Sequence, residues 1–364
     1  MHIGIIGCGQ LARMLALAGI GMGFRFSFVN DNGSPDTPCV DGLGAIATWE
    51  PGDSAAALYE ALGRPDCITV EKEQVDSRLL ESLAEVCALH PNRDSVEIIK
   101  DRRREKGLVD QLDIPTARYV VGVTAAEAVN TLGYPAVAKS CTEGYDGKNQ
   151  WVIRSEEDAA RFDGQEDPSD YIFEQFIPFD REVSLVAARN LQGEVTAYPL
   201  AQNSHDKGIL RRTIVPAPDT SDSLSARALD YITRLLNHLD YVGVLAMECF
   251  VHGEELLVNE LAPRVHNSGH WSQLGADTCQ FENHLRAISG MSLGSTRVDA
   301  VAGMENLIGV EYPALSNIGS HSALNWYGKS VRPGRKLGHV NFIAKDYAEL
   351  DAMMGAFVSA SGEV

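Results

Sequence analysis

The stretch GVLAMECFVHGEELLVNEL (residues 243–261) carries the strongest indication of fold and of chemistry in this chain. Two apolar runs, Gly243–Val251 and Leu256–Leu261, flank a short polar turn, a pattern that predicts a β-hairpin. Each run contains a single carboxylate, Glu248 in the first and Glu260 in the second. The relative position of these two carboxylates therefore depends on how the hairpin turns.

With Gly253–Glu255 as a three-residue loop, His252 pairs with Leu256, and Glu248 then lies directly opposite Glu260. Opposed like charges destabilise a sheet, and burying charge costs more. A bound Mg²⁺ removes both penalties, because carboxylates and substrate phosphates are its usual ligands. A different loop length, with both side chains in solvent, is the alternative. The hairpin therefore predicts a metal site, and this prediction depends on the register in which Glu248 pairs with Glu260.

The segment APRVHNSGHW (residues 262–271) follows the hairpin, is dense in polar groups and shows no hydrophobic period. His266 and His270 stand four residues apart, a spacing that suits zinc ligands on a helix. Pro263 and Gly269 favour a loop instead, and no cysteine or third carboxylate completes a zinc set. We interpret the segment as an anion-binding loop, with a surface loop bonded to itself as the alternative.

A lysine ends an apolar run earlier in the chain, at Ala136–Lys139, and the loop EGYDGKNQ (residues 143–150) follows it. A lysine at the end of a buried strand is costly unless it meets an anion. A glycine-bearing loop can fold its backbone N–H groups over phosphates. The pair therefore suggests a phosphate site, and a solvated lysine before a simple hairpin turn is the alternative.

The N-terminal hundred residues alternate strand and helix signals, which predicts a parallel, doubly wound sheet. Strands are expected at Ile3–Ile6, Phe24–Val29 and Cys67–Val70, and GCGQLA (residues 7–12) fits the pattern G-x-G-x-x-A between a strand and a helix. Glycines there let an anion approach the helix N-terminus. Dinucleotide binding is one interpretation; a phosphate that belongs to another ligand is the one we favour.

Cations are concentrated in one short segment, KSVRPGRK (residues 329–336), which has four cations and no acid. The whole chain of 364 residues holds 31 Lys and Arg against 50 Asp and Glu, a net charge of −19. Such a surface repels polyanions, so we expect neither a nucleic-acid partner nor an anionic membrane. The basic segment suits a small phosphate, with a solvated basic turn as the alternative.

The seven cysteines are scattered and form no C-x-x-C pair, which indicates a reducing, cytoplasmic location and excludes a disulfide framework. No apolar run approaches the roughly 20 residues of a membrane span. The start, MHIGIIGCGQ, lacks the cationic region of a signal peptide. The sequence therefore predicts a cytoplasmic protein that binds small molecules.

The chain divides into three predicted domains of an α/β protein. A charged helical segment ends at Ile114-Pro115, where the residue before proline disfavours helix, and we place the first boundary there. Residues 115–183 resemble a small α+β module, and residues 184–364 are strand-rich. Residues 1–114 are expected to form a Rossmann-like parallel sheet.

Taken together, these motifs resemble the ATP-grasp superfamily and, more narrowly, the 5-(carboxyamino)imidazole ribonucleotide synthetases. The resemblance covers nearly the whole chain and is strongest in GCGQLARM, GYDGKNQ, AMECF, NELAPRVHNSGHW and WYGKSVRPGRKLGH. It implies an ATP-grasp fold in which residues 115–183 form a lid over a larger C-terminal domain, with ATP between them. It also implies a homodimer.

The resemblance assigns the nucleotide site. Glu248 and Glu260 would hold Mg²⁺, with Mn²⁺ as an alternative, and Lys139 would contact the phosphates. Residues 144–150 would close over the nucleotide, residues 174–177 would form the adenine hinge, and Glu182 would bind the ribose. The expected ATP contacts are Arg102, Lys139, Gly144, Tyr145, Asp146, Gly147, Lys148, Asn149, Gln150, Glu174, Gln175, Phe176, Ile177, Glu182, His205, Asn259 and Glu260.

The reaction implied is a step of purine biosynthesis. ATP phosphorylates bicarbonate to carboxyphosphate, and the amine of 5-aminoimidazole ribonucleotide then attacks the carbonyl carbon. Asp146 would orient the amine or accept its proton, and Lys329 would lie at the 5′-phosphate. The expected bicarbonate ligands are Arg264, His266 and Asn267. The expected ribonucleotide contacts are Gly9, Gln10, Leu11, Tyr145, Ser268, Lys329, Arg332 and Arg335.

Three positions depart from the family pattern. Ala262 stands where many ATP-grasp enzymes have a metal-binding asparagine, so the metal must rest on Glu248, Glu260, phosphates and water. Asn149 replaces a common glycine, a change we expect to be tolerated because asparagine adopts left-handed conformations readily. Ala12 replaces another glycine and changes packing slightly.

Two other functions remain as alternatives. A related purine ligase, such as the formate-dependent glycinamide ribonucleotide transformylase, would share the metal pair but lack the bicarbonate loop. An NAD(P)-dependent oxidoreductase would use GCGQLA but would leave Glu248, Glu260 and residues 262–271 unexplained.

Overall fold

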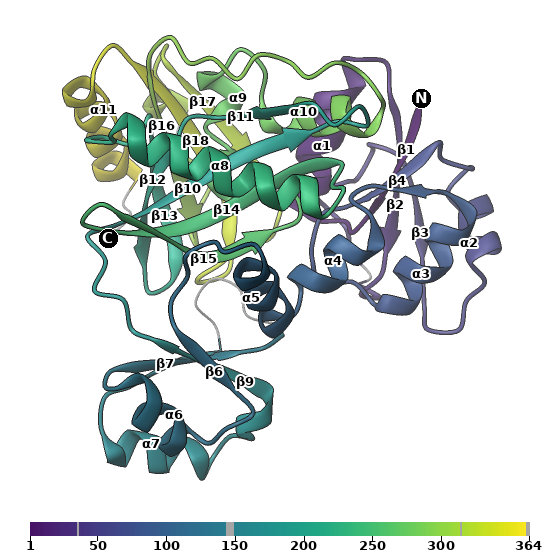
Figure 1. Cartoon of the computed structure of the whole chain (residues 1–364). Coiled ribbons are helices and arrows are strands. Elements are labelled where there is room, and N and C mark those ends of the chain that lie inside the picture. Colours follow the sequence, from purple (N-terminus) through teal and green to yellow (C-terminus); the bar gives the residue numbers. More distant parts are fainter. Residues whose placement is uncertain (35, 143–148, 314, 362–364) are drawn as a thin grey trace.

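The computed structural model describes residues 1–34, 36–142, 149–313 and 315–361, and Figure 1 shows its arrangement. Within these residues the strands form three sheets, of five, four and nine strands. No helix in this described part of the chain is both long and apolar enough to cross a membrane.

The N-terminal sheet is parallel throughout, in the order β3-β2-β1-β4-β5. Strand β1 is buried along its whole length, as expected where helices cover both faces of a parallel sheet. The strands are β1 (His2–Ile6), β2 (Arg25–Asn30), β3 (Ala45–Thr48), β4 (Cys67–Val70) and β5 (Ala88–Leu89). The helices are α1 (Gln10–Ile20), α2 (Ala55–Ala61), α3 (Ser77–Val86) and α4 (Arg93–Ile99).

A small antiparallel sheet, in the order β6-β9-β7-β8, forms the lower lobe of Figure 1. Its core is aromatic: the ring of Phe162 meets those of Trp151, Tyr171 and Phe173 edge to face at 5.0–5.7 Å. Helix α5 (Arg102–Gln111) leads into the lobe. The lobe's elements are β6 (Tyr119–Val121), α6 (Ala125–Leu132), β7 (Ala136–Ser140), β8 (Gln150–Ile153), α7 (Glu156–Asp163), η1 (Pro168–Asp170) and β9 (Tyr171–Gln175).

The largest sheet is antiparallel and runs in the order β15-β14-β10-β12-β13-β16-β18-β17, with β11 paired to β10. Its strands are β10 (Arg181–Arg189), β11 (Val195–Ala197), β12 (Ala201–Asp206), β13 (Ile209–Val215), β14 (Gly243–His252), β15 (Glu255–Ala262), β16 (Val301–Ile308), β17 (Ser322–Trp326) and β18 (Lys336–Ala344). Its helical segments are α8 (Asp222–His238), η2 (Asn267–Gly269), α9 (Ser272–Gly275), α10 (Gln280–Ile288), η3 (Leu315–Asn317) and α11 (Tyr347–Ser361).

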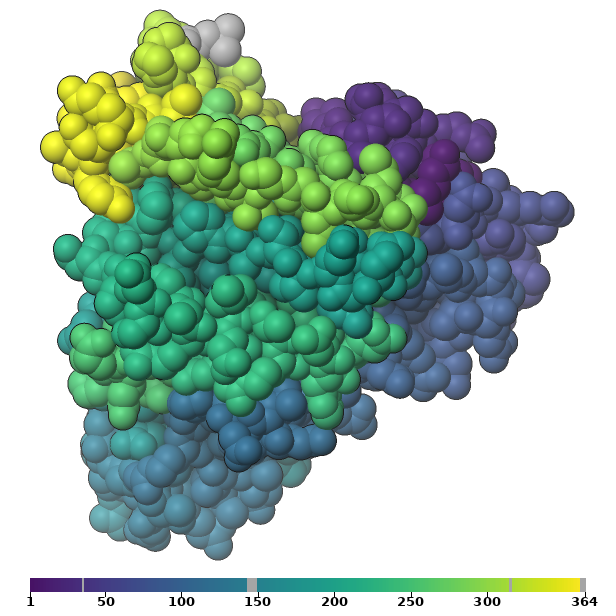
Figure 2. Space-filling view, turned by 45° about the horizontal axis from the view of Figure 1, so that its top comes forward, coloured from purple at the N-terminus to yellow at the C-terminus, as the bar shows by residue number. Residues whose placement is uncertain are grey.

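The N-terminal and largest sheets share one of their hydrophobic cores, while the small sheet has a separate core. Helix α1 packs on α10, and Leu15 and Phe281 are both fully buried in the shared core. Thr69 Oγ1 also lies 2.8 Å from His284 Nε2 across this boundary. In Figure 2 the purple N-terminal residues accordingly abut the yellow-green ones near the top of the view.

This architecture confirms the predicted α/β class, with a parallel N-terminal sheet and antiparallel sheets after it. The expected strands near residues 3–6, 24–29 and 67–70 are β1, β2 and β4. Helix α11 was not predicted from the sequence, because its apolar side chains are spread around the helix rather than along one face.

Candidate active site

One cavity of about 1180 Å³ gathers side chains from all three sheets. It brings together most of the residues predicted from sequence, although these come from distant parts of the chain. The predicted residues that line it are Gly9, Gln10, Leu11, Arg102, Lys139, Asn149, Gln150, Glu174, Gln175, Phe176, Ile177, Glu182, His205, Glu248, Asn259, Glu260, Arg264, His266 and Asn267.

The predicted hairpin forms, but its turn is shorter than expected. Two residues, Gly253 and Glu254, join β14 to β15, and His252 pairs with Glu255. The predicted three-residue loop and the pairing of His252 with Leu256 are therefore wrong. Gly253 has φ +57°, the left-handed conformation that tight hairpin turns favour.

The two carboxylates nevertheless lie opposite each other, because a β-bulge compensates for the shorter turn. Cys249 pairs with Val258, but the next residue back, Glu248, pairs with Glu260. Asn259 is the extra residue, and its side chain also lines the cavity. The prediction that Glu248 faces Glu260 is thus confirmed, by a path different from the one assumed.

The electrostatics of this pair fit a cation. Burial and the charge of Glu260 together raise the pKa of Glu248 to about 7. Arg102 donates to Glu260 Oε2 at 2.9 Å, and His266 Nε2 lies 3.5 Å from Glu248 Oε1. Among the described residues, no group of three or more His, Cys, Asp or Glu side chains could hold a metal ion. Two opposed carboxylates are a donor set that fits Mg²⁺, whose usual further ligands are phosphates and water.

Lys139 is held by the buried carboxylate of Glu174, a residue predicted only for the adenine hinge. Its Nζ lies 2.8 Å from Glu174 Oε2 and 2.9 Å from Asn259 Oδ1. Lys106 Nζ lies 3.5 Å from the other oxygen of Glu174. Burial opposes ionisation of Glu174, but the two lysines outweigh it and lower its pKa to about 2.

Lys139 lies at the end of β7, which is buried along most of its length, as the sequence predicted. Burial lowers the pKa of this lysine, and the charge of Glu174 partly offsets the shift. Contacts with Glu174 and Asn259 hold the lysine in the wall of the cavity.

The segment 262–271 is a loop, as predicted, and a buried glutamine fixes its backbone. Gln280 accepts from His266 N at 2.9 Å and donates to His266 O at 2.7 Å. Burial lowers the pKa of His266 well below its usual value, so the ring is neutral. Ser268 is buried beneath the loop, and its Oγ lies 2.9 Å from His266 Nδ1.

Two partners of the loop's side chains were missed by the sequence analysis. Glu73 meets Arg264 through two contacts, of 2.5 and 3.2 Å, and Arg264 lowers the pKa of Glu73 despite its burial. Asn306 exchanges two hydrogen bonds with Asn267. Glu73 follows the carboxyl end of the parallel strand β4, where ligands commonly bind. That position in the sequence could have indicated Glu73 as a site residue.

The N-terminus of α1 holds a carboxylate rather than an open anion site. Glu71 accepts hydrogen bonds from the backbone of Gly9 and of Ala12, the latter at 2.9 Å. The predicted phosphate position at this helix is therefore filled by Glu71. Gln10 still lines the cavity, and its Oε1 accepts from Lys329 Nζ at 2.5 Å.

The basic segment divides between the cavity and the surface. Lys336 lines the cavity, and Lys329 reaches its rim through Gln10. Arg332 is exposed, and Arg335 donates to Ser330 O at 3.1 Å and to Ser330 Oγ at 2.7 Å. The structure therefore places neither of these two arginines among the cavity-lining residues.

Two of the predicted nucleotide contacts form an acid–base pair. Glu182 and His205, on adjacent strands β10 and β12, are hydrogen bonded through Oε2 and Nδ1. Burial opposes protonation of His205, but this hydrogen bond and the charge of Glu248 raise its pKa overall. Both side chains line the cavity.

The glycine-bearing loop is only partly described. Gly144, Tyr145, Asp146, Gly147 and Lys148 lie outside the described residues, so their predicted roles stay predictions. Asn149 is described and has φ +55°, the left-handed conformation expected for it.

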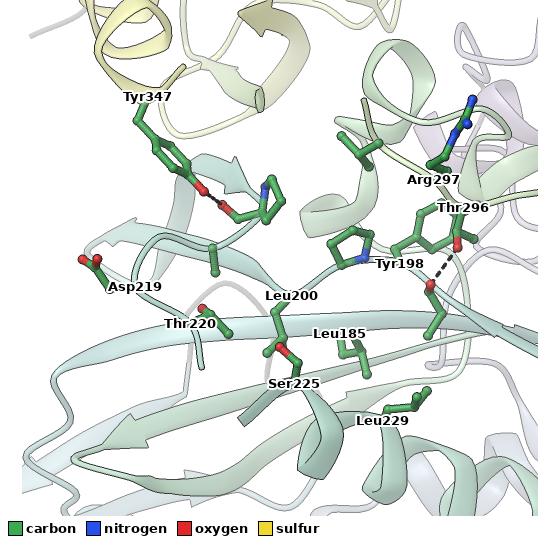
Figure 3. Close-up of a pocket in the computed structure, with 15 residues that line it drawn as sticks. Leu185, Tyr198, Leu200, Asp219, Thr220, Ser225, Leu229, Thr296, Arg297 and Tyr347 are labelled. Atoms are coloured by element: carbon green, nitrogen blue, oxygen red, sulfur yellow. Dashed lines mark hydrogen bonds between the residues drawn. The ribbon is translucent and has the colours of Figure 1, made fainter. Parts of the chain in front are cut away.

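A cavity of about 700 Å³ lies outside this site and is drawn in Figure 3. Its wall is largely apolar, and polar groups on it bond within the protein. Tyr347 donates to Pro216 O at 3.0 Å, and Thr296 donates to Ala197 O at 2.7 Å. The larger cavity, which gathers the residues predicted from the sequence, is therefore the candidate site.

Comparison with known proteins agrees with this geometry. Three family models match: the ribonucleotide synthetase preATP-grasp domain at residues 1–100, the ATP-grasp domain at residues 107–281, and the phosphoribosylaminoimidazole carboxylase C-terminal domain at residues 302–353. The N5-carboxyaminoimidazole ribonucleotide synthase of Pseudomonas aeruginosa is 41% identical, over 97% of each chain.

Solved structures are equally similar. The N5-carboxyaminoimidazole ribonucleotide synthetase of Thermus thermophilus superposes with a TM-score of 0.92 at 41% identity, covering 100% of this chain and 99% of its own. An ADP complex of such a synthetase gives a TM-score of 0.89 at 34% identity, covering 98% and 96%. The chain therefore belongs to the N5-carboxyaminoimidazole ribonucleotide synthase family of ATP-grasp enzymes.

Proposed function

We propose that this chain carboxylates the amine of 5-aminoimidazole ribonucleotide with ATP and bicarbonate, in purine biosynthesis. The products are N5-carboxyaminoimidazole ribonucleotide, ADP and phosphate. The observation that carries the proposal is the position of the opposed pair Glu248 and Glu260 beside the loop that holds Arg264, His266 and Asn267. A metal–phosphate site and an anion-binding loop then share one cavity.

Phosphoryl transfer depends chiefly on positioning and on neutralising charge. Glu248 and Glu260 would hold Mg²⁺, which supplies charge stabilisation at the transferred phosphoryl group. Lys139, held by Glu174, would also contact the phosphates. Bicarbonate oxygen attacks the γ-phosphorus, so that ADP leaves and carboxyphosphate remains.

The loop would hold bicarbonate with one charged group and two neutral ones. Arg264 is fixed by Glu73, and neutral His266 and Asn267 add polar groups. The substrate amine then attacks the carbonyl carbon, phosphate leaves, and the amine loses one proton. Asp146 is the predicted acceptor. The ribonucleotide would lie toward Gln10 and Lys329.

The decisive experiment supplies Mg-ATP, bicarbonate and 5-aminoimidazole ribonucleotide and measures ADP and the carboxylated product. We expect ADP formation that requires all three, and no turnover in carbonate-depleted buffer. Turnover with formate and glycinamide ribonucleotide instead would support the transformylase alternative. Tight NADH binding without nucleotide-dependent thermal stabilisation would support the oxidoreductase. Either result, or no bicarbonate dependence, contradicts the proposal.

We also propose a homodimer and a cytoplasmic location, on the family resemblance and on the scattered, unpaired cysteines. Sedimentation equilibrium of the purified chain tests the first. A single species at the 39.5 kDa monomer mass would contradict it.

A further inference from the structure

Asn306 is a buried polar residue with no role in the reaction as proposed so far. It lies on β16, is fully buried, and makes three hydrogen bonds. Its Nδ2 donates to Leu210 O at 2.8 Å and to Asn267 Oδ1 at 2.7 Å, while its Oδ1 accepts from Asn267 Nδ2 at 3.1 Å. Two side-chain amides thus form a closed ring of hydrogen bonds.

The ring fixes which way each amide points. The carbonyl of Leu210 can only accept, so the nitrogen of Asn306 must lie on its side. Asn306 therefore presents one donor and one acceptor to Asn267. If Asn267 rotated by half a turn, its NH₂ group would face the NH₂ group of Asn306, and its oxygen would face an oxygen. One amide orientation of Asn267 is consequently favoured.

We infer that Asn306 is a positioning residue that orients the Asn267 amide toward bicarbonate; this inference rests on the proposed function. In the favoured orientation, Asn267 keeps one N–H hydrogen and one lone pair beyond the ring. Asn267 lines the cavity, so the remaining N–H can meet an anion oxygen. A donor already oriented needs no rearrangement when the substrate binds.

The other contacts of the loop show why the N–H donor of Asn267 matters and why its orientation can be tested separately. Arg264 is already paired with Glu73, and His266 Nδ1 is paired with Ser268 Oγ, so the free N–H of Asn267 adds a donor of fixed direction to the site. Gln280 holds the backbone of His266 independently of Asn306. Loss of Asn306 should therefore release the side chain of Asn267 while the loop keeps its course.

The test is a double-mutant cycle in which the KM for bicarbonate is measured. Asn306→Leu, which keeps the branching of the side chain but removes its polar atoms, is expected to raise this KM at least tenfold, while the KM for ATP changes less than twofold. In the Asn267→Ala background, Asn306→Leu should change the KM for bicarbonate less than twofold. Additive effects of the two substitutions, or an unchanged KM in the single variant, would overturn the inference.

A matched control separates positioning from stability. Asn283 is equally buried and makes comparable bonds, to Tyr198 Oη at 2.8 Å and to Gly294 N at 2.7 Å. Asn283→Leu should lower the melting temperature without changing the KM for bicarbonate per folded enzyme. An equal rise in the control's KM would contradict a specific role for Asn306.

A second variant serves if Asn306→Leu does not fold. Asn306→Asp keeps the shape but presents an oxygen to both orientations of Asn267, so the KM for bicarbonate should rise here too. An unchanged KM in this variant would also overturn the inference. Wild-type enzyme that shows no bicarbonate dependence would instead reject the proposed function itself.

Discussion

Carboxylates hold the positive groups of this site in place. Glu174 holds Lys139, Glu73 holds Arg264, and Glu260 holds Arg102. Glu71 has a comparable role at the N-terminus of α1, where it accepts a hydrogen bond from the backbone N–H of Gly9. These three cations of the cavity are therefore held by a carboxylate in the absence of substrate. The cost is that substrate must share each cation with a carboxylate.

Replacing Glu260 with Gln tests the metal assignment. We expect at least a hundredfold loss of Mg-ATP-dependent turnover, because one of the two opposed carboxylates can no longer bind the ion. Measurement of ADP release across a range of Mg²⁺ concentrations checks this. Glu254→Gln, in the exposed turn of the same hairpin, makes the same charge change and should retain activity. Near-normal turnover of Glu260→Gln would contradict the assignment.

Glu174 predicts a pH-dependent contribution to stability. Its pKa is about 2 in the fold and 4.5 in the reference state, so the charged form is stabilised. That contribution is complete above pH 4.5 and is lost as pH falls from 4.5 toward 2. Glu174→Gln should lower the free energy of unfolding by roughly 3 kcal/mol at pH 7, and the difference should shrink below pH 4.5.

Urea unfolding of wild type and Glu174→Gln between pH 3 and 7 measures this difference. Exposed Glu157→Gln serves as the control and should change stability little at any pH in the range. A difference that grows on acidification would have the wrong sign for an ion-paired carboxylate.

At the scale of elements, local patterns predicted the hairpin but not its details. The apolar runs and single carboxylates were visible in the sequence, and the resulting opposition of Glu248 and Glu260 is confirmed. The turn length was wrong, and the bulge at Asn259 was not foreseen. Asn259 binds Lys139, which comes from the small sheet, so this contact depends on tertiary structure that a local pattern does not contain.

The same limit explains the missed site residues. Glu73, Asn306 and Lys106 belong to no recognised motif, and their partners lie 191, 39 and 68 residues away. The loop 262–271 was recognised because its polar residues are contiguous. The clustered part of the site was thus predictable from sequence, and the part assembled by folding was not.

The β1–α1 turn yields a prediction at this scale. Gly7 has φ +116°, and a Cβ there would lie 2.4 Å from Glu71 Cγ. Gly7→Ala should therefore add a steric collision to backbone strain of about 1–3 kcal/mol. Gly23→Ala is the matched control, since Gly23 has φ +81° but nothing within 4 Å. In urea unfolding, Gly7→Ala should cost clearly more than the control; equal losses would contradict the contact with Glu71.

At the scale of the molecule, the net charge of −19 describes the outside and not the site. The acidic surface still argues against polyanion partners. The cations that matter are few and line one cavity, where they come from helix α5, the small sheet, and the largest sheet with the loop after β15: Arg102, Lys139, Arg264 and Lys336. Composition could therefore exclude classes of partner, but only the arrangement of the sheets could assemble the site.

The division of the core predicts how the molecule opens. Phe162 is buried in the core of the small sheet, whereas Phe281 is buried in the core that the N-terminal and largest sheets share. Removing either ring should cost about 3–5 kcal/mol locally. Phe162→Ala should accelerate hydrogen exchange within residues 119–175, while β1 and β14 stay protected. Phe281→Ala should accelerate exchange in both β1 and β14, because residues of both strands pack in the core that contains Phe281. Hydrogen-exchange mass spectrometry distinguishes the outcomes. If Phe162→Ala accelerated exchange equally in all three sheets, the small sheet would not be an independent unit. Lys139, which the small sheet contributes to the site, could then not move without unfolding of the other two sheets.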